Sequence, residues 1–288
     1  MSGEKEFVQH LQHLKIGSIE DLLQQIGEPG ARIICGGTDL LVKMRSGAIS
    51  PERLLDISEI DALRAIEEKD GRIEIGAAVT ESEILASELV TVCLPLLRTA
   101  LVHLGSLQIR NRGTLGGNLV NASPAADSAV PLLLYNAELI LQRAGSERSI
   151  PVEEFFRGPG QTALASGEFL RTVSIPIPRE GFDPFFHKVG RRRALAIAIA
   201  SLGALLWVEG GVVAEARLAA GSVAPTAIRL SRTENLLTGE KITPELIAQA
   251  RELAAQEVSP ITDIRASAGY RREVIGDLVE RFLNEVVG

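Results

Sequence analysis

The sequence predicts an α+β fold, in which hairpins and helices follow one another without a regular order. Two turn signals indicate antiparallel hairpins, because Asp70-Gly71 and Gly210-Gly211 each lie between segments of strand-like residues. A third signal is the stretch after residue 243, where helix caps precede apolar residues at helical spacing. A doubly wound sheet requires strands and helices in strict alternation, so this mixture favours α+β.

In the first half of the chain, caps and turn residues mark the elements. Ser18 is a favourable N-cap residue, and Thr80 with Glu83 has the spacing of a capping box. The expected elements are a helix from Ser18 to Gly27, a buried strand over 31–35, a helix over 38–44, the hairpin at Asp70-Gly71, a helix after Thr80, a helix over 95–107 and a helix that ends at Leu134.

The second half begins with a region of mixed signals. Residues 151–178 combine strand and turn patterns, and the proline-rich segment 175–181 is the best boundary between domains. We therefore expect one domain over 1–178 and another over 179–288. The second is expected to contain a hairpin across 209–211, a helix that begins at Thr243 with Pro244 in its first position, and a helix over 266–286.

Two glycine pairs are suited to holding an anion. The loops Gly36-Gly37-Thr38-Asp39 and Gly116-Gly117-Asn118 both offer backbone N–H groups with little side chain in the way. Glycine lets the backbone approach a phosphate closely, and successive N–H groups in a tight turn form an anion-binding concavity. Neither loop has the Rossmann or P-loop spacing, and a plain turn is the alternative for either pair alone. Together the two loops predict a bound dinucleotide.

Four ordered blocks of sequence carry a family resemblance. They are residues 33–41, 108–127, 186–198 and 221–226, followed nearer the C-terminus by 265–272. In these blocks the chain resembles the flavin-binding medium subunit of the molybdenum hydroxylases, the family of xanthine dehydrogenase and aerobic carbon monoxide dehydrogenase. There are two departures. Cys35 stands where the family usually has Ala, and the extra cysteine-bearing cluster loop of some relatives is missing.

The resemblance implies a fold, a cofactor and the residues that hold the cofactor. The fold is a two-part FAD-binding domain of the PCMH type, followed by a smaller C-terminal α+β domain with an antiparallel sheet and helices. The two glycine loops close on the FAD pyrophosphate from opposite sides. The residues that the resemblance assigns to FAD are Ile34, Cys35, Gly36, Gly37, Thr38, Asp39, Leu104, Thr114, Gly116, Gly117, Asn118, Asp127, Leu170 and Lys188.

Four of these residues receive specific roles from the resemblance. Asp127 matches an acid that accepts from a hydroxyl of the flavin chain. Lys188 matches a lysine at the flavin, where a cation stabilises negative charge on the reduced ring and raises its potential. Leu104 and Leu170 match apolar positions beside FAD. The alternatives are an acid in the first turn of a helix for Asp127, a surface lysine for Lys188 and plain core for the leucines.

Charge and cysteine content exclude several classes of function. With 37 acidic against 30 basic residues the net charge is −7, which argues against nucleic-acid binding. Cys35 and Cys93 are too few for a four-thiolate iron–sulfur cluster, and we expect both to be buried and neutral. No motif predicts a metal site. The longest apolar run, 194–208, is shorter than a membrane helix needs, so a cytoplasmic protein without a membrane segment is expected.

The resemblance finally implies an electron-transfer subunit. A molybdopterin-binding large subunit and an iron–sulfur small subunit would deliver electrons to FAD on this chain, which passes them to NAD or another acceptor. Two alternatives stay open, a self-contained FAD-dependent reductase or oxidase of the same broad fold and an assembly scaffold whose flavin site has decayed. The first of these needs its own general acid or base, for which the sequence offers no clear candidate.

Overall fold

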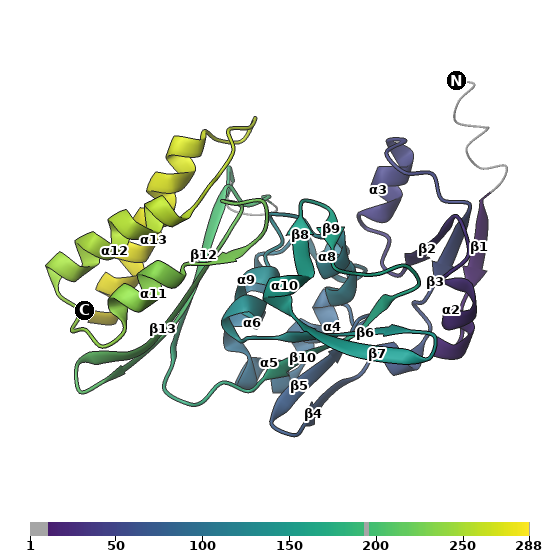
Figure 1. Cartoon of the computed structure of the whole chain (residues 1–288), viewed down its shortest axis with the longest axis horizontal. Helices are drawn as coiled ribbons and strands as arrows, with labels where there is room; N and C mark the ends of the chain where they lie inside the picture. The colour runs from purple at the N-terminus through teal and green to yellow at the C-terminus, as the bar shows by residue number, and fades with distance from the viewer. Residues whose placement is uncertain (1–10, 193–195, 288) are drawn as a thin grey trace.

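The computed structural model describes residues 11–192 and 196–287, whose strands form four sheets (Figure 1). A three-stranded sheet and a five-stranded sheet come from the chain before residue 178, and a four-stranded sheet comes from the chain after it. The remaining sheet is a two-stranded ribbon of β8 (Phe156–Gly158) and β9 (Gln161–Thr162). Separate sheets with helices packed beside them confirm the predicted α+β class.

The first sheet is small and parallel, with the order β1-β3-β2. The strand expected over 31–35 is present as β2, but it is an edge strand and only partly buried, which corrects the expectation of full burial. Ser18 caps the following helix as expected, because its side chain accepts from Asp21 N. The elements are β1 (Gln12–Lys15), α2 (Ile19–Gln25), β2 (Ala31–Ile34), α3 (Leu40–Arg45) and β3 (Arg53–Asp56).

The second sheet is antiparallel, with the order β4-β5-β10-β6-β7. The expected hairpin joins β4 to β5, and both turn residues have positive φ, 51° at Asp70 and 73° at Gly71. The central strand β10 begins almost 100 residues after its neighbour β5, so the pairing of these two strands is a long-range contact. The elements are η1 (Asp61–Leu63), β4 (Ile66–Lys69), β5 (Arg72–Gly76), β6 (Glu138–Arg143), β7 (Ser146–Pro151) and β10 (Phe169–Pro176).

Seven short helices accompany the second sheet among the described residues. The capping box at Thr80 and Glu83 is formed in full. The helix expected over 95–107 ends at Val102, because Gly105 takes a left-handed φ of 48° and Ser106 caps a new helix. The helices are α4 (Glu81–Ala86), α5 (Glu88–Cys93), α6 (Pro95–Val102), α7 (Leu107–Arg110), α8 (Leu115–Asn121), α9 (Ala129–Leu134) and α10 (Val152–Phe155).

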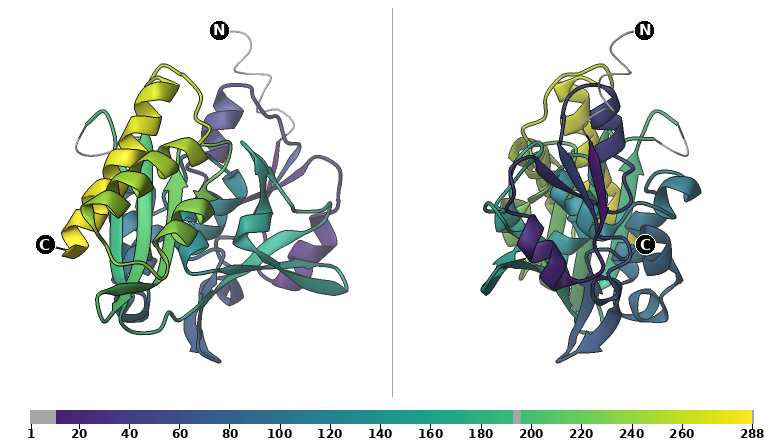
Figure 2. Two further views of the ribbon diagram at one scale, coloured as in Figure 1. Left: turned by 60° about the vertical axis from the view of Figure 1, so that its left-hand side comes forward. Right: turned by 90° about the vertical axis from the view of Figure 1, so that its right-hand side faces the viewer.

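The C-terminal sheet is an antiparallel meander, and three helices cover one of its faces (Figures 1 and 2). The hairpin across 209–211 and the Thr243 cap with Pro244 in the first turn are as predicted. Helix α11 was not expected from the sequence. The elements are β11 (Asp183–Val189), β12 (Ala200–Glu209), β13 (Val212–Gly221), β14 (Ile228–Arg229), α11 (Ser231–Leu237), α12 (Pro244–Glu257) and α13 (Ala268–Val287).

Helix α9 joins the two halves of the molecule. It packs on the face of β12 and β13 that the three C-terminal helices leave open. Consequently Phe186, Leu205 and Ala219 of the C-terminal sheet belong to the hydrophobic core of the second sheet. Burial of this continuous apolar surface fixes the two halves against each other. None of the helices described by the structure is long and apolar enough to cross a membrane.

Candidate functional site

The two glycine loops lie against each other, although about 80 residues separate them in sequence. A Cβ on Gly36 would stand 1.8 Å from the carbonyl oxygen of Arg112 and 3.1 Å from Cα of Gly113. A second link joins α3, which follows the first loop, to α8, which contains the second glycine pair, since Lys43 Nζ donates to Asn121 Oδ1 over 2.5 Å. Only a residue without a side chain permits the contact at position 36, so glycine is required there.

The first loop supplies unused hydrogen-bond donors. It follows Ile34 at the end of β2, turns through Gly37 with a φ of 71° and leads into α3. Within the described parts of the chain, the backbone N–H groups of residues 36–39 form no hydrogen bond. Successive free N–H groups at such a turn are the donor set that binds a phosphate.

The second glycine pair does not lie in a free loop, which corrects the expectation from the sequence: it forms the first turn of α8, behind the N-cap Thr114. The N–H groups of this turn, still called the second loop below, are already occupied. Gly116 N donates to Ala77 O, Gly117 N to Thr114 Oγ1 and Asn118 N to Thr114 O. Gly116 is also packed tightly, since a Cβ there would lie 2.6 Å from Ala77 Cβ. This turn therefore presents the exposed Gly117 and the partly exposed Asn118 at the surface, while Gly116 serves the packing on Ala77.

Cys35 lies between β2 and the first loop. It is half-buried, which corrects the expectation of a fully buried residue, and so is Cys93. Burial raises the pKa of the Cys35 thiol to about 11, and the nearby carboxylate of Asp56 raises it further. The thiol is therefore neutral at physiological pH and does not repel an anion in the adjacent loop, as the sequence predicted.

Asp127 and Lys188 form a buried ion pair that bridges the two halves of the molecule. Lys188 lies on β11, and Asp127 lies just before α9. Lys188 Nζ is 2.5 Å from Asp127 Oδ2 and donates to His103 O at 2.9 Å. The side chains are 8% and 5% exposed. Burial raises the pKa of Asp127 to about 6, against the opposing effect of Lys188. Asp127 lies one residue before the N-cap of α9 and so is not the first-turn acid that the sequence left as its alternative, and Lys188 is not a surface lysine.

One carboxylate oxygen of this ion pair is free to accept a hydrogen bond. Asp127 Oδ1 is buried and has no hydrogen-bond partner among residues 11–192 and 196–287. A buried carboxylate oxygen without a partner is costly, so it is suited to accept from a ligand hydroxyl. Nearby, Ser128 Oγ donates to Asn118 Oδ1 over 2.7 Å, which ties the second loop to the start of α9.

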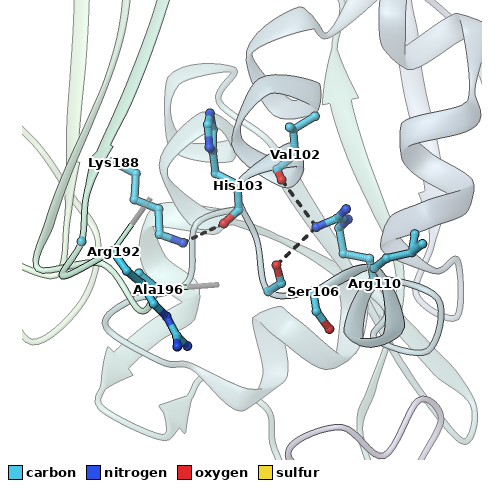
Figure 3. Close-up of a pocket in the computed structure, with 10 residues that line it drawn as sticks. Val102, His103, Ser106, Arg110, Lys188, Arg192 and Ala196 are labelled. Carbon is cyan, nitrogen blue, oxygen red and sulfur yellow. Dashed lines mark hydrogen bonds between the residues drawn. The ribbon is translucent and has the colours of Figure 1, made fainter. Parts of the chain in front are cut away.

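A pocket of about 260 Å³ opens beside Lys188 (Figure 3). Arg110 is held at its wall by donation to Leu104 O at 2.8 Å, and the Nε of Arg110 has no partner within the described chain. Leu104 and Leu170 are buried in one hydrophobic cluster. Both are therefore core residues, which is the alternative that the sequence left open for them. The lining residues are Val102, His103, Gly105, Ser106, Leu107, Arg110, Lys188, Gly190, Arg192 and Ala196.

These features fit a dinucleotide that carries a diphosphate and a hydroxylated chain. The free N–H groups of residues 36–39 suit the diphosphate, and Asp127 Oδ1 suits a hydroxyl. Lys188 supplies a desolvated positive charge in the same region. The block 186–198 is described except for residues 193–195, which lie outside the described chain.

Sequence reasoning missed two charged residues at this site. Glu81 is buried next to Gly113, and Arg110 lines the pocket. Glu81 looked like an ordinary acid in the first turn of a capped helix, where the dipole favours it. Arg110 stood within a quoted block without a role. Only the fold of the 107–114 segment onto α4 distinguishes them from surface charges.

Comparisons with protein families cover most of the chain. The model described as "FAD binding domain in molybdopterin dehydrogenase" matches residues 9–178. The model described as "CO dehydrogenase flavoprotein C-terminal domain" matches residues 185–286.

Individual relatives agree over nearly their full length. The chain is 31% identical to the carbon monoxide dehydrogenase medium chain of Hydrogenophaga pseudoflava, over 93% of each chain. It is 30% identical to the glyceraldehyde dehydrogenase medium chain of Sulfolobus acidocaldarius, over 95% of this chain and 97% of that one. Among solved structures, quinoline 2-oxidoreductase from Pseudomonas putida 86 superposes with a TM-score of 0.91 and 30% identity, over 96% of each chain.

Proposed function

The chain belongs to the FAD-binding medium subunits of the molybdenum hydroxylase family, and on that premise we propose how it works within a dehydrogenase complex. It is an FAD-dependent oxidoreductase subunit that needs partner subunits for full activity. An iron–sulfur small subunit and a molybdopterin-binding large subunit are the partners. When bound here, FAD supplies the step that accepts electrons from the iron–sulfur subunit and passes them to NAD or another acceptor.

The observation that carries this proposal is the contact between the two glycine loops. The unpartnered N–H groups of Gly36, Gly37, Thr38 and Asp39 bind the diphosphate, with Ile34 and Cys35 as the neutral approach to them. The second loop covers the opposite side of the diphosphate, where the exposed Gly117 allows close approach and Gly116 holds the turn against Ala77. Thr114 and Asn118 add side-chain groups. The two loops have different roles because the N–H groups of the first are unpaired, whereas those of the second already form hydrogen bonds.

The ion pair and the two leucines serve the rest of the cofactor. Asp127 accepts a hydrogen bond from a hydroxyl of the flavin chain through Oδ1, while Oδ2 stays with Lys188. Lys188 places its positive charge at the edge of the pocket, where it favours added negative charge on a bound ring. Leu104 and Leu170 exclude water from the apolar side. The proposed domain boundary, 1–178 against 179–288, places Lys188 in the C-terminal domain and all other residues of the set in the first.

A titration of the cofactor-free full chain with FAD tests the proposal. We expect one FAD bound per chain, displaced by ADP and unaffected by riboflavin, because the loops bind the diphosphate that riboflavin lacks. A chain that shows no affinity for FAD, or one from which riboflavin displaces FAD as well as ADP does, would contradict the proposed site.

The electron path is tested on the complex with both partner subunits. We expect the substrate-reduced complex to be reoxidised by NAD or by an alternative acceptor, with the return of oxidised-flavin absorbance. Turnover of NADH with an artificial dye by this chain alone would instead favour a self-contained reductase.

A further inference from the structure

Glu81 is a buried acid at the back of the second glycine loop. It occupies the first position of α4 and is 2% exposed. Its own N–H donates to Gly113 O at 3.0 Å, and a Cβ on Gly113 would stand 2.9 Å from Glu81 Oε2. That oxygen has no hydrogen-bond partner in the part of the chain that the structure describes. A buried carboxyl group without a partner calls for an explanation.

The first turn of α4 braces the segment that leads into the second loop. Thr80 and Thr114 form an isolated β-bridge, and Ser82 Oγ donates to Asn111 Oδ1 over 2.6 Å. Gly113 also borders the first loop, because its Cα lies 3.1 Å from the point where a Cβ on Gly36 would stand. A single glycine residue, Gly113, thus separates the carboxyl group of Glu81 from the loop whose free N–H groups bind the diphosphate.

Two charged residues from neighbouring segments act on Glu81. Arg110 of α7 favours its ionised form, and Asp127, on the turn before α9, disfavours it. Glu83, on the same helix, is engaged by Arg64 and by the cap at Thr80. Burial has the largest effect and raises the pKa of Glu81 to about 8. At pH 7 the group is therefore mostly the neutral carboxylic acid.

We propose that Glu81 is a positioning residue for the cofactor diphosphate, which supports the second loop as a neutral acid and weakens FAD binding when it ionises. The inference rests on the proposed FAD site. Ionisation would place a negative charge behind Gly113, close to an anionic ligand and to Asp127, within a region of low dielectric. FAD binding in turn favours the protonated form, because the two equilibria are linked.

The test measures the dissociation constant of FAD from the full chain between pH 7 and pH 9. For the wild type we expect up to about a tenfold loss of affinity over this range, since Glu81 passes from mostly protonated to mostly ionised. The variant Glu81→Gln copies the neutral acid, so its affinity should stay constant and equal the wild-type value at pH 7. The matched control is Glu88→Gln, an exposed acid at the same first position of α5, which should behave like the wild type.

Each outcome separates this inference from the proposed function. A wild type that binds FAD with constant affinity across the range, or a Glu81→Gln variant with the wild-type slope, would overturn the role of Glu81 and leave the FAD site intact. A wild type that binds no FAD at any pH would overturn the site itself.

A second measurement needs no variant. Calorimetry in buffers of different ionisation enthalpy reports the protons taken up when FAD binds. At pH 8 we expect uptake of about half a proton per FAD, because binding completes the protonation of a half-ionised group. The pKa of Asp127 is about 6 and that of Cys35 about 11, so neither contributes at this pH. Zero uptake would overturn the proposal even if the variant failed to fold.

Discussion

Gly36 is the residue at which the two halves of the proposed diphosphate site touch. The carbonyl group of Arg112 occupies the space that a side chain at position 36 would need. Because this neighbour is backbone, no side-chain rotation can relieve the clash. Small-to-large changes in packed positions cost about 1–3 kcal/mol. A substitution here therefore separates the loops before it disturbs either of them internally.

We predict that Gly36→Ala lowers FAD affinity at least about tenfold and destabilises the chain by about 1–3 kcal/mol. FAD titration and thermal unfolding measure the two effects. The matched control is Gly27→Ala, because Gly27 has nothing within 4 Å of a Cβ and no positive φ. A variant that binds FAD as tightly as the control would show that the loops do not act as one site.

Lys188 keeps Asp127 ionised inside the protein. Burial alone favours the protonated acid, and Lys188 opposes it. Because the folded pKa of about 6 is above the ordinary value of 3.8, Asp127 contributes stability that is complete at low pH and is lost as pH rises through 6. Removal of Lys188 raises the folded pKa of Asp127 further, so the loss extends to higher pH.

We predict that Lys188→Met weakens FAD binding and costs more stability at pH 8 than at pH 5. The loss in the free energy of unfolding, relative to the wild type, should reach about 3 kcal/mol at pH 8, because an unpaired buried charge remains there. Chemical denaturation at the two pH values provides the measurement, and Lys69→Met at an exposed lysine is the control. Equal destabilisation at both values would mean that the lysine acts by packing alone.

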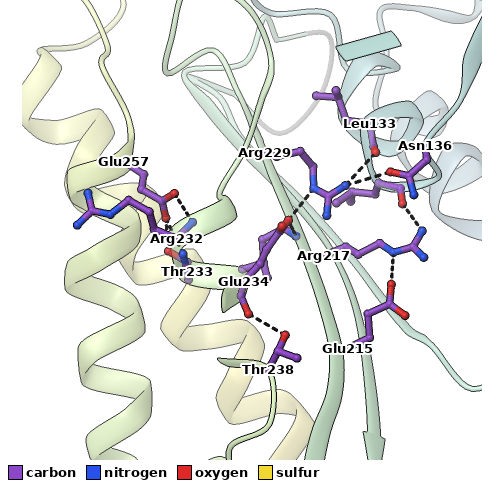
Figure 4. Close-up of polar contacts among 12 residues, drawn as sticks. Leu133, Asn136, Glu215, Arg217, Arg229, Arg232, Thr233, Glu234, Thr238 and Glu257 are labelled. Carbon is purple, nitrogen blue, oxygen red and sulfur yellow. Dashed lines mark hydrogen bonds and ion pairs between the residues drawn. The ribbon is translucent and has the colours of Figure 1, made fainter. Parts of the chain in front are cut away.

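At the scale of elements, α9 connects the site to the C-terminal sheet. Its start follows Asp127, and its end is held by two arginines of the sheet (Figure 4). Arg217 donates to Leu134 O at 2.9 Å, and Arg229 donates to Leu133 O at 3.4 Å and to Asn136 Oδ1 at 3.2 Å. Cations at the C-terminal end satisfy its free carbonyl groups. The position of Asp127 therefore depends on contacts at the opposite end of the helix.

We predict that the double variant of Arg217→Ala and Arg229→Ala lowers stability by about 2 kcal/mol and FAD affinity several-fold. Part of the cost arises at Glu234, which loses its ion pair with Arg229 while it still accepts from Leu218 N. Unfolding curves and FAD titration report both effects. Arg232→Ala, at an exposed arginine of α11, is the control and should change neither. Loss of stability with unchanged FAD affinity would rule out transmission through α9.

At the scale of the whole molecule, the proposed cofactor site needs both halves of the chain in contact. Asp127 and Lys188 come from opposite sides of the junction, and glycine lets β12 lie flat against α9. A Cβ on Gly203 would stand 2.7 Å from Val130 Cγ1 and 3.0 Å from Leu134 Cδ1. The close packing of the two domains is thus a condition for the ion pair.

We predict that Gly203→Val loosens this junction, with a loss of about 1–3 kcal/mol in stability and a parallel loss of FAD affinity. Thermal unfolding with and without FAD measures both, because a ligand stabilises only the state that binds it. Gly269→Ala, with open space around it at the start of α13, is the control. Retention of full FAD affinity in Gly203→Val would show that the junction tolerates the added side chain.

Local chemistry was enough to predict many elements of this fold. Thr80 with Glu83, Asp70-Gly71, and Thr243 with Pro244 each act through neighbours within four residues, and each prediction is confirmed. Two predictions failed where the local signal was weak or was interrupted. The helix over 95–107 ended early because Gly105 took a left-handed φ, and α11 was missed because its amphipathic signal is short.

The sequence by itself determined the local turns, the caps and the membership of a family, because these depend on residue order over short distances. The tertiary structure alone decided which groups meet. It placed Gly36 on Arg112, joined Asp127 to Lys188 across the domain junction and buried Glu81 behind Gly113. Such contacts depend on chain topology and on the desolvation that packing imposes, and residue order does not reveal either directly.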